Sequence, residues 1–529
     1  MKKFSLISTL QIVFAAVSAS AFLFSLWVLY LIPFYGDDLW HLSSLRSYTF
    51  WDLLTKPVFG DSNHIPVFHL WMWLLSFLPH DFPWIHLVQG GLLILTCFLF
   101  HIYLLQMSIP AWIRWMSTAL FLTTPTIAQA VFWSSATHLW FGSIWILSAL
   151  ILLPRRSEES VFWRWSGCFI CLPLAMMSTE LSYGFCVLFI VLVALKYRRN
   201  FKIFSGCLIT SLLMVAIVAQ RNHLVTGNWA QLSLDRELER PLILKEIYIS
   251  AYELFVYSHP LSMLDKFSQG YLLHERLSEG WLAFHLAWMT LFWFIILMRR
   301  GRNGWDLALL VFTPPLMIII GNGLVYERYL IASIIANGLG MAIFVDCFRP
   351  LISGKLAKTF GVLAIFVVLI NLSVFVRHSL AQWVNTAVRH HAILDLVQRE
   401  HPDVRNPIGL VDSLSQNFRP LKDREWMSAP TNTVHELQMI LSNLNYPYCL
   451  YDLLDELPFE GYKYRDAHMK SLNNLKKQCI WPPQKLRCYK YFQTSMVTGE
   501  FHSYSGQGKV LYLQEKNAVH PQEHLVRCL

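Results

Sequence analysis

Charged residues are scarce in this chain of 529 residues. Only 15% of the residues are Asp, Glu, Lys or Arg, whereas average soluble domains contain about 25%. The sequence also lacks internal repeats, low-complexity segments and the short motifs of many soluble enzymes, which are the Gly-rich phosphate loop, the G-x-S-x-G turn and the H-E-x-x-H helix. These absences argue against an ordinary soluble enzyme and against a cytosolic nucleotide held by a Rossmann-type domain.

Long apolar runs take the place of the missing charge. Hydrophobic residues make up 55% of the chain, and several runs approach or exceed the ~20 residues that span a hydrocarbon core. We predict an all-α polytopic membrane domain with about eleven transmembrane helices. The predicted spans are 6–32, 84–106, 112–128, 136–153, 164–178, 180–196, 203–220, 281–298, 306–321, 329–347 and 358–376. The apolar segment 65–78 is interpreted as re-entrant or interfacial.

Basic residues lie mostly beside these spans and give the chain a formal net charge of +9. With the N-terminus inside, the inner loops carry most of the Lys and Arg, as the positive-inside rule requires. The longer segments 33–83, 221–280 and 377–529 then lie outside. The basic residues are expected to contact anionic membrane lipids rather than nucleic acid. The Lys2-Lys3 start and the lack of an endoplasmic-reticulum retention signal favour a bacterial inner membrane, with the outer loops in the periplasm.

The tail differs in composition from the rest of the chain. Residues 377–529 are polar and rich in turn signals, with β-like runs at 478–481 and 509–513 and a helical pattern over 433–444. We predict a small α+β extracytoplasmic domain there, after a transmembrane domain over residues 1–376. The tail contains four of the ten cysteines, and an outside position would allow them to form disulfides.

Asp37 and Asp38 form an acidic pair directly after the first predicted span. Two adjacent carboxylates at a membrane surface are costly to desolvate, and each raises the pKa of the other. That tuning suits a general base that accepts a proton from a hydroxyl or amine nucleophile. The alternative is that one of the two aspartates caps a helix lying on the membrane.

Three further segments carry candidate residues. His64 and His69, with the two aspartates, have the residue types of a metal site, but a spacing of five does not place both histidines on one helical face. We therefore expect no metal, and His64 is instead a candidate contact to a phosphate. Glu180, in Ser178-Thr179-Glu180, is an acidic residue at membrane depth, where a functional role and a structural ion pair are both reasonable.

Glu327, Arg328 and Tyr329 open a late span from the outer side, after Gly321-Asn322-Gly323. Arg328 is permanently charged and can hold a phosphate through two parallel hydrogen bonds. The alternative is a structural ion pair between Glu327 and Arg328. An anionic lipid substrate would need such a cation.

The order of these motifs resembles a known family. The acidic pair is followed by the run His64-Ile-Pro-Val-Phe-His-Leu-Trp-Met-Trp-Leu-Leu and by Phe82-Pro-Trp-Ile-His86-Leu-Val. Then come Thr124-Pro125 through Trp133, Ser178-Thr179-Glu180 and Glu327-Arg-Tyr. This layout, over residues 1–376, is similar to the polytopic glycosyltransferases of the GT-C fold class, which use polyprenyl-phosphate sugars. Protein O-mannosyltransferases and lipid A aminoarabinose transferases belong to that class. At 178–180 the sequence departs from a Ser-Lys-Glu-type junction, because Thr179 replaces the basic residue.

The resemblance implies an inverting sugar transfer from a polyprenyl-phosphate donor to a glycan, lipid or protein acceptor on the non-cytoplasmic face. Asp37 or Asp38 would deprotonate the acceptor. Arg328, with His64, would stabilise the departing phosphate, and Glu180, Glu327 and Tyr329 would belong to the substrate site. No cofactor is implied.

Two other functions fit parts of the pattern. An O-antigen ligase or polymerase-like enzyme also has many spans, but it would carry its key Arg and His in a late outer loop, and 221–280 shows no clear motif for this. A transporter or flippase for a lipid-linked glycan would show charges along a central path and inverted repeats. Neither feature is found in the sequence.

Overall fold

The computed structural model describes most of the apolar helices and six strands of the tail. The described residues are 6–32, 45, 48–56, 65–77, 84–154, 162–226, 259, 279–300, 302–321, 330–351, 354–384, 387, 408–411, 450–452, 490–493, 498–503, 509–514 and 522–525. Two units are distinguished by their internal contacts. The first, called the helical unit, comprises Met1–Tyr30, Tyr48–Met72 and Trp84–Leu380, and the second comprises Leu31–Ser47, Trp73–Pro83 and Ala381–Leu529.

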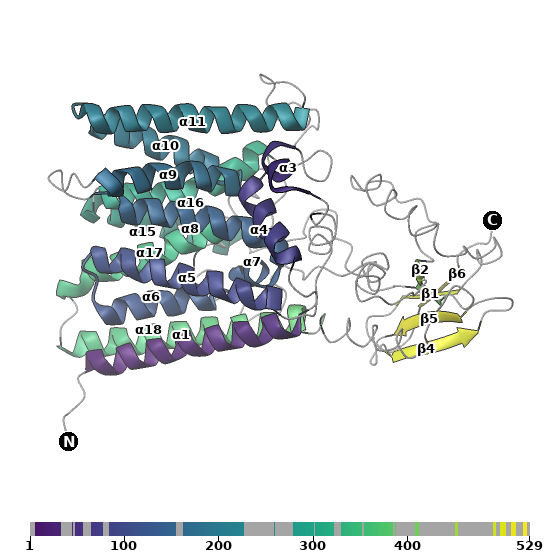
Figure 1. Cartoon of the computed structure of the whole chain (residues 1–529). Coiled ribbons are helices and arrows are strands. Elements are labelled where there is room, and N and C mark those ends of the chain that lie inside the picture. The colour runs from purple at the N-terminus through teal and green to yellow at the C-terminus, as the bar shows by residue number, and fades with distance from the viewer. Residues whose placement is uncertain are drawn as a thin grey trace. The chain divides into compact units, whose positions relative to one another are not determined.

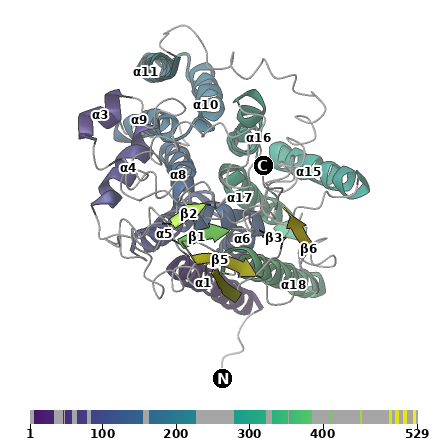
Figure 2. The ribbon, with the colours of Figure 1, turned by 90° about the vertical axis from the view of Figure 1, so that its right-hand side faces the viewer.

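Helices of the helical unit run side by side (Figure 1) and are seen end-on in Figure 2. The first half of the chain forms α1 (Leu6–Leu31), α3 (Phe50–Thr55), α4 (Pro66–Ser76), α5 (Trp84–Gln106), α6 (Ala111–Thr123), the 3-10 turn η1 (Pro125–Ile127), α7 (Ala128–Phe132), the 3-10 turn η2 (Ser134–Ala136) and α8 (Thr137–Leu152). The second half forms α9 (Phe162–Ser178), α10 (Ser182–Lys196), α11 (Phe201–Thr226), α15 (Glu279–Arg300), α16 (Arg302–Gly321), α17 (Ile331–Phe348), the 3-10 turn η5 (Arg349–Leu351), α18 (Gly354–Ser379) and the π-helical turn η6 (Leu380–Val384).

Helix α17 occupies the interior of the helical unit. In the most apolar stretch of α17, 78% of the residues are buried. In the corresponding stretch of α11 the share is only 22%, which identifies α11 as a peripheral helix. Polar side chains fix α17 to its neighbours: Asn337 accepts a hydrogen bond from Trp293 Nε1 at 3.2 Å, and Ser333 donates to the Val311 carbonyl at 3.0 Å. Hydrogen bonds of this kind hold helices together where lipid tails remove the hydrophobic drive between them.

Within the described residues, five helices are long and apolar enough to cross a membrane: Ile7–Leu31, His86–Gln106, Phe201–Arg221, Ile331–Phe348 and Thr359–Ser379. A sixth span results if the bent pair Pro125–Phe132 and Thr137–Leu152 counts as one. Several apolar helices therefore identify an integral membrane protein. The predicted number of about eleven is not confirmed, since other helices are shorter than ~20 residues. Among these, α6 has 13 residues, α10 has 15 and α9 has 17.

One predicted boundary is wrong for a physical reason. The span expected over 112–128 ends at Thr123, because Pro125 lacks an N–H and disfavours helical backbone at the residue before it. Thr124 accordingly has ψ 115°, and the chain continues as η1 and α7, which lie at 110° to α8. The span expected over 203–220 agrees with the apolar stretch Phe201–Arg221, and helix α11 continues beyond it to Thr226.

Helix α3 lies within the segment expected to be the outer loop 33–83. Its first turn is capped reciprocally: Asp52 N–H donates to Thr49 Oγ1 at 3.2 Å, and Thr49 N–H donates to Asp52 Oδ2 at 3.0 Å. Lys56 is 2.5 Å from Asp52 Oδ1. The ammonium of Lys56, and then the Thr49 donors, hold the pKa of Asp52 well below its usual range. Helix α3 is thus a well-defined exposed helix, with Trp51 70% exposed.

Strands of the tail form two sheets. The larger sheet has the order β2 (Leu450–Asp452), β1 (Ile408–Val411), β5 (Lys509–Gln514), β4 (Thr498–Ser503). Its β1 is parallel to both neighbours, with Gly409 opposite Tyr451 and Val510, and β4 and β5 are antiparallel. The smaller sheet pairs β3 (Lys490–Gln493) with β6 (Gln522–Leu525), antiparallel. The strand expected over 509–513 is confirmed as β5, while 478–481 and 433–444 lie outside the described residues.

Candidate functional site

Glu180 lies in the turn that joins α9 to α10. Helix α9 ends at Ser178, and the backbone turns over Thr179–Leu181, with Ser182 N–H donating to the Thr179 carbonyl at 3.2 Å and Tyr183 N–H to the Glu180 carbonyl at 3.0 Å. The Thr179 hydroxyl accepts a hydrogen bond from Leu181 N–H at 3.4 Å. This local bonding satisfies backbone groups that a helix end otherwise leaves open, and it fixes where the Glu180 side chain begins.

Arg221 forms an ion pair with Glu180, joining the last part of α11 to the α9–α10 turn. The bond runs from an Arg221 terminal nitrogen, Nη2, to Glu180 Oε1. The other terminal nitrogen, Nη1, lies 3.5 Å from the Tyr183 hydroxyl, and the guanidinium lies 5.8 Å from the centre of the Tyr183 ring. Arg221 is 12% exposed and Glu180 is 35% exposed. We call Glu180, Tyr183 and Arg221 the ion-pair cluster.

One donor of this guanidinium is unused. Within the described part of the chain, Arg221 Nε is buried and has no hydrogen-bond partner. A buried donor of this kind costs free energy unless a ligand or water satisfies it. An arginine with a donor to spare, beside a partly exposed carboxylate, has the chemistry of an anion site, because its planar fork matches the oxygens of phosphate.

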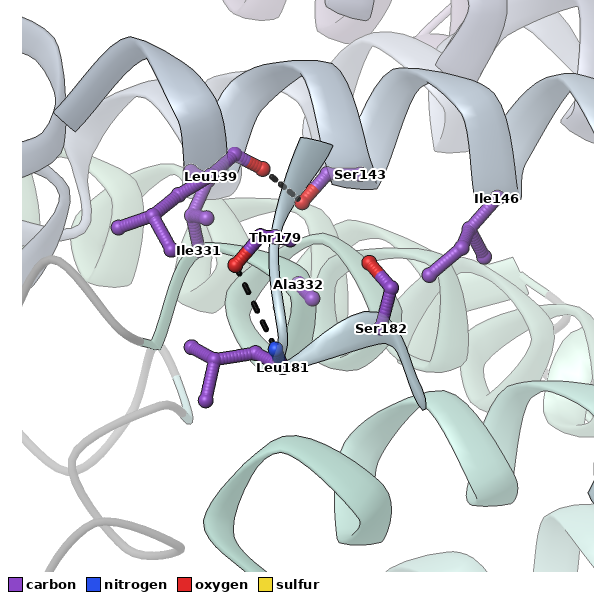
Figure 3. Close-up of a pocket in the computed structure, with 8 residues that line it drawn as sticks. All are labelled: Leu139, Ser143, Ile146, Thr179, Leu181, Ser182, Ile331 and Ala332. Atoms are coloured by element: carbon purple, nitrogen blue, oxygen red, sulfur yellow. Dashed lines mark hydrogen bonds between the residues drawn. The ribbon is translucent and has the colours of Figure 1, made fainter. Parts of the chain in front are cut away.

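A small pocket adjoins the α9–α10 turn (Figure 3). It is lined from α8, from the turn with the start of α10, and from the start of α17, by Leu139, Ser143, Ile146, Thr179, Leu181, Ser182, Ile331 and Ala332. Ser143 donates its hydroxyl to the Leu139 carbonyl at 2.9 Å, a bond drawn in Figure 3. The lining is mainly apolar with three hydroxyl groups, and the space that it encloses has room for about one water molecule.

Close packing of α8 against the turn depends on Gly142. A Cβ at Gly142 would lie 2.3 Å from Thr179 Cγ2 and 2.8 Å from Ser182 Oγ. No side chain larger than hydrogen fits there without movement of the turn. Gly142 therefore sets the distance between α8 and the residues that carry Glu180.

Of the predicted site residues, the described part of the chain contains only Glu180. The others lie outside the described residues: Asp37, Asp38, His64, Glu327, Arg328 and Tyr329. The residues that follow 327–329 in the chain are described, and two of them, Ile331 and Ala332, line the pocket beside Thr179. One pocket is thus lined by residues from two segments that are distant in the sequence. These are the segment 178–180 and the start of α17, which follows residues 327–329.

Of the four residues considered as metal ligands, Asp37, Asp38 and His64 lie outside the described residues. The fourth, His69, is only 1% exposed, and its ring lies 5.8 Å from the ring of Phe68. Within the described ranges no three His, Cys, Asp or Glu side chains gather as a metal site would require.

A second buried polar cluster lies where α5 begins and α7 bends into α8. Ser134 Oγ is 3.0 Å from His86 Nδ1, and Gln89 Nε2 donates to Thr137 Oγ1 at 3.1 Å. Thr137 in turn donates to the Ser134 carbonyl at 2.5 Å. All four side chains are buried. These bonds satisfy polar groups freed by the broken helix, so we interpret the cluster as structural support for the bend.

Sequence reasoning missed Arg221. The predicted span ended at residue 220, which made Arg221 an ordinary first residue of a loop. The available signal was its sign: a positive charge at the predicted outer end of an apolar helix runs against the positive-inside bias. A cation at that position, where basic residues are uncommon, indicates a specific anionic partner.

No protein-family model matches the sequence, and no curated protein matches it. Two solved structures from Cupriavidus metallidurans are similar to this one. ArnT bound to undecaprenyl phosphate has a TM-score of 0.45 at 10% identity, and ArnT in the apo state has a TM-score of 0.43 at 11% identity. Each comparison covers 88% of this chain and 88% of that chain.

Proposed function

We propose that this chain is an integral membrane glycosyltransferase of the GT-C type, which moves a sugar from a polyprenyl-phosphate donor to a glycan, lipid or protein acceptor. The observation that carries the proposal is Arg221: a buried guanidinium with an unused Nε donor, held by an ion pair with Glu180 in the α9–α10 turn. The phosphate head of a polyprenyl-phosphate donor presents the oxygens that such a guanidinium recognises.

In the proposed reaction an acceptor hydroxyl or amine attacks the anomeric carbon of the sugar. A new bond forms from the acceptor atom to that carbon, while the bond from the carbon to the phosphate oxygen breaks and the polyprenyl phosphate leaves. Asp37 or Asp38 takes the acceptor proton. Attack from the face opposite the leaving group inverts the configuration of the anomeric carbon.

Arg221 is proposed to stabilise the negative charge that develops on the leaving phosphate. Glu180 acts through Arg221, since their ion pair sets the direction of the guanidinium. Arg328, with His64, is proposed to add further positive charge or hydrogen bonds at the phosphate, and Glu327 and Tyr329 to complete the substrate site. This arrangement gives arginine the role that a divalent cation plays in other phosphate chemistry. The proposed reaction therefore uses no cofactor.

The site is proposed to face the non-cytoplasmic side of a bacterial inner membrane, with residues 377–529 forming an α+β extracytoplasmic domain after a membrane domain over 1–376. Support comes from the charges: Lys196 is the last residue of α10 and Arg198 and Arg199 follow it, whereas Glu180 precedes the start of the helix. Because basic residues favour the inner side, the opposite end of α10 is expected outside.

A sugar-transfer assay with purified full-length protein tests the proposal. The substrates are a polyprenyl-phosphate sugar and a membrane extract that supplies acceptors. We expect Arg221→Gln to reduce kcat by about 10²–10³-fold, as removal of a charge-stabilising donor does elsewhere. Arg221→Lys should recover only part of this, because an ammonium lacks the planar fork.

Three controls sharpen the assay. Arg349→Gln removes an exposed arginine paired with Asp346 at 3.6 Å and should leave the rate unchanged.

Asp37→Asn and Asp38→Asn identify the base, with an expected loss of about 10²–10⁴-fold for one of them. Chelation of divalent metals should not change the rate. Absence of transfer by a well-folded wild-type protein, or full activity of Arg221→Gln, would refute the proposal.

A further inference from the structure

A dense group of cations lies where α10 meets α11. Four of the seven residues from 196 to 202 are basic, namely Lys196, Arg198, Arg199 and Lys202, and all four are exposed. We call these four residues the basic patch. Its backbone is ordered by local bonds: Asn200 N–H donates to the Tyr197 carbonyl at 2.8 Å, and Ile203 N–H donates to Asn200 Oδ1 at 3.3 Å.

The basic patch has no carboxylate of its own. In the described part of the chain the ion pairs are Lys56–Asp52, Arg221–Glu180 and Arg349–Asp346, and no member of the patch takes part in one. Four like charges held in a short, ordered turn repel one another unless an anion approaches. An anion from outside the described residues would relieve that repulsion.

Aromatic side chains lie in and next to the patch along the chain and at the start of α9, whose Trp165 contacts Tyr197. Tyr197, inside it, is contacted from α9 by Trp165 with the ring centres 5.1 Å apart, and Lys196 Nζ lies 5.0 Å from the centre of the Tyr197 ring. Phe162, Trp163 and Phe201 are 84%, 62% and 81% exposed. Exposed aromatic rings beside cations at helix ends are typical of the level of lipid head groups.

We propose that the basic patch binds the anionic head group of a membrane phospholipid. The arginine and lysine side chains would contact its phosphate, and its acyl chains would lie on the exposed apolar side chains of the neighbouring helices, among them Leu195 and Leu192. A soluble anion such as inorganic phosphate, or a nucleic acid, would match the cations but leave these apolar side chains uncovered. A phospholipid satisfies both.

This site differs from the ion-pair cluster. Helix α10 has 15 residues between Ser182 and Lys196, and a rise of 1.5 Å per residue separates its ends by about 22 Å. Glu180 precedes one end and the basic patch begins at the other. The inference therefore does not depend on the proposed sugar transfer, and each can fail without the other.

Lipid binding to the purified full-length protein tests the proposal. The protein, in a neutral detergent, is titrated with phosphatidylglycerol or phosphatidylcholine, and bound lipid per protein is measured by native mass spectrometry. We expect phosphatidylglycerol to bind more tightly. Since each cation near an anionic lipid contributes about 1 kcal/mol, Arg198→Gln combined with Arg199→Gln should weaken its binding roughly thirtyfold.

Two variants separate the patch from other causes. Arg198→Lys combined with Arg199→Lys keeps the charge and should retain most of the binding. Arg349→Gln removes a paired arginine elsewhere and should change nothing. Equal binding of both lipids by the wild type, or unchanged binding in the double Gln variant, would overturn the proposal. Displacement of the lipid by inorganic phosphate, at matched ionic strength, would also overturn it, because the patch would then be a site for a free anion.

Discussion

Arg221 is a buried cation at the end of an otherwise apolar helix. Its contacts with Glu180 and Tyr183 offset the free-energy cost of burying the charge. Removal of either charge leaves the other without its partner. Because Glu180 is 35% exposed, water compensates part of the loss. We expect Glu180→Gln and Arg221→Gln each to lower the free energy of unfolding by about 1–3 kcal/mol.

The double variant separates the pair from its surroundings. If the ion pair is the main interaction, Glu180→Gln with Arg221→Gln should cost clearly less than the sum of the two single variants. Unfolding of the purified protein in detergent, followed by circular dichroism, gives the values. Strict additivity would contradict a direct interaction and would leave Arg221 held by other groups.

Ser108 has the left-handed backbone conformation that glycine adopts most easily, with φ 58°. It follows the end of α5, where Ile109 N–H donates to the Leu104 carbonyl at 3.1 Å and Ser108 N–H to the Leu105 carbonyl at 2.9 Å. This is the Schellman arrangement of a helix end. We expect Ser108→Gly to stabilise the protein by about 1 kcal/mol, because it removes the steric cost of a Cβ at positive φ.

Ser108→Ala is the matched control, since alanine keeps the Cβ and removes only the hydroxyl. It should give no gain. The measurement is the thermal unfolding midpoint in detergent. A gain for alanine equal to that for glycine would show that the backbone strain at Ser108 is not the cause.

At the scale of single residues, the sequence was informative where the chemistry is local. Glu180 was singled out as an acidic side chain at membrane depth, with a structural ion pair as one of its two interpretations, and the structure provides the pair. Its partner could not be named, because Arg221 is 41 residues away and the pairing depends on how α11 packs against α10. The catalytic role of Asp37 or Asp38 stays a prediction.

At the scale of elements, the contact between α8 and the α9–α10 turn depends on Gly142. A Cβ there would overlap Thr179 Cγ2, and Thr179 is a β-branched residue with little rotamer freedom. We expect Gly142→Ala to lower the free energy of unfolding by about 1–3 kcal/mol, as overpacking does in other cores. Denaturant unfolding of the purified protein measures the change.

Two variants make this prediction specific. Gly91→Ala, at a helical glycine where nothing lies within 4 Å of the added Cβ, should be stabilising by about 0.5–1 kcal/mol. Thr179→Ser removes the overlapping methyl group and should restore most of the stability of Gly142→Ala. Failure of that rescue would show that the contact between Cβ and Cγ2 is not responsible.

The break between α6 and α8 shows the limit of reading elements from apolar runs. Residues 112–128 are apolar enough to predict one span, and the helical run ends at Thr123 because Pro125 follows. The proline was visible in the sequence. The 110° bend of α7 against α8 was not, because the residues that bond to it come from a distant segment: His86 and Gln89 of α5 bond to Ser134 and Thr137 at the bend.

At the scale of the whole molecule, composition alone predicted an integral membrane protein, since a lack of charge and many apolar runs exclude most other classes. The number of spans was harder, because helices of 13 to 17 residues inside the bundle resemble full spans in sequence. In the tail, the β5 strand was predicted from its own residues. Its pairing with β1, about a hundred residues earlier, has no local signal.

Orientation in the membrane is the remaining whole-molecule prediction, and the structure supplies two exposed positions to test it. Thr55 is exposed in α3 and Asn200 is exposed in the turn between α10 and α11. In a variant whose ten natural cysteines are replaced by alanine or serine, a membrane-impermeant maleimide should label Thr55→Cys in intact cells. It should label Asn200→Cys only after permeabilisation, because the cations around Asn200 favour the inner side. The reverse pattern would place the α9–α10 turn, and with it the ion-pair cluster, on the cytoplasmic side and would contradict the proposed face of sugar transfer.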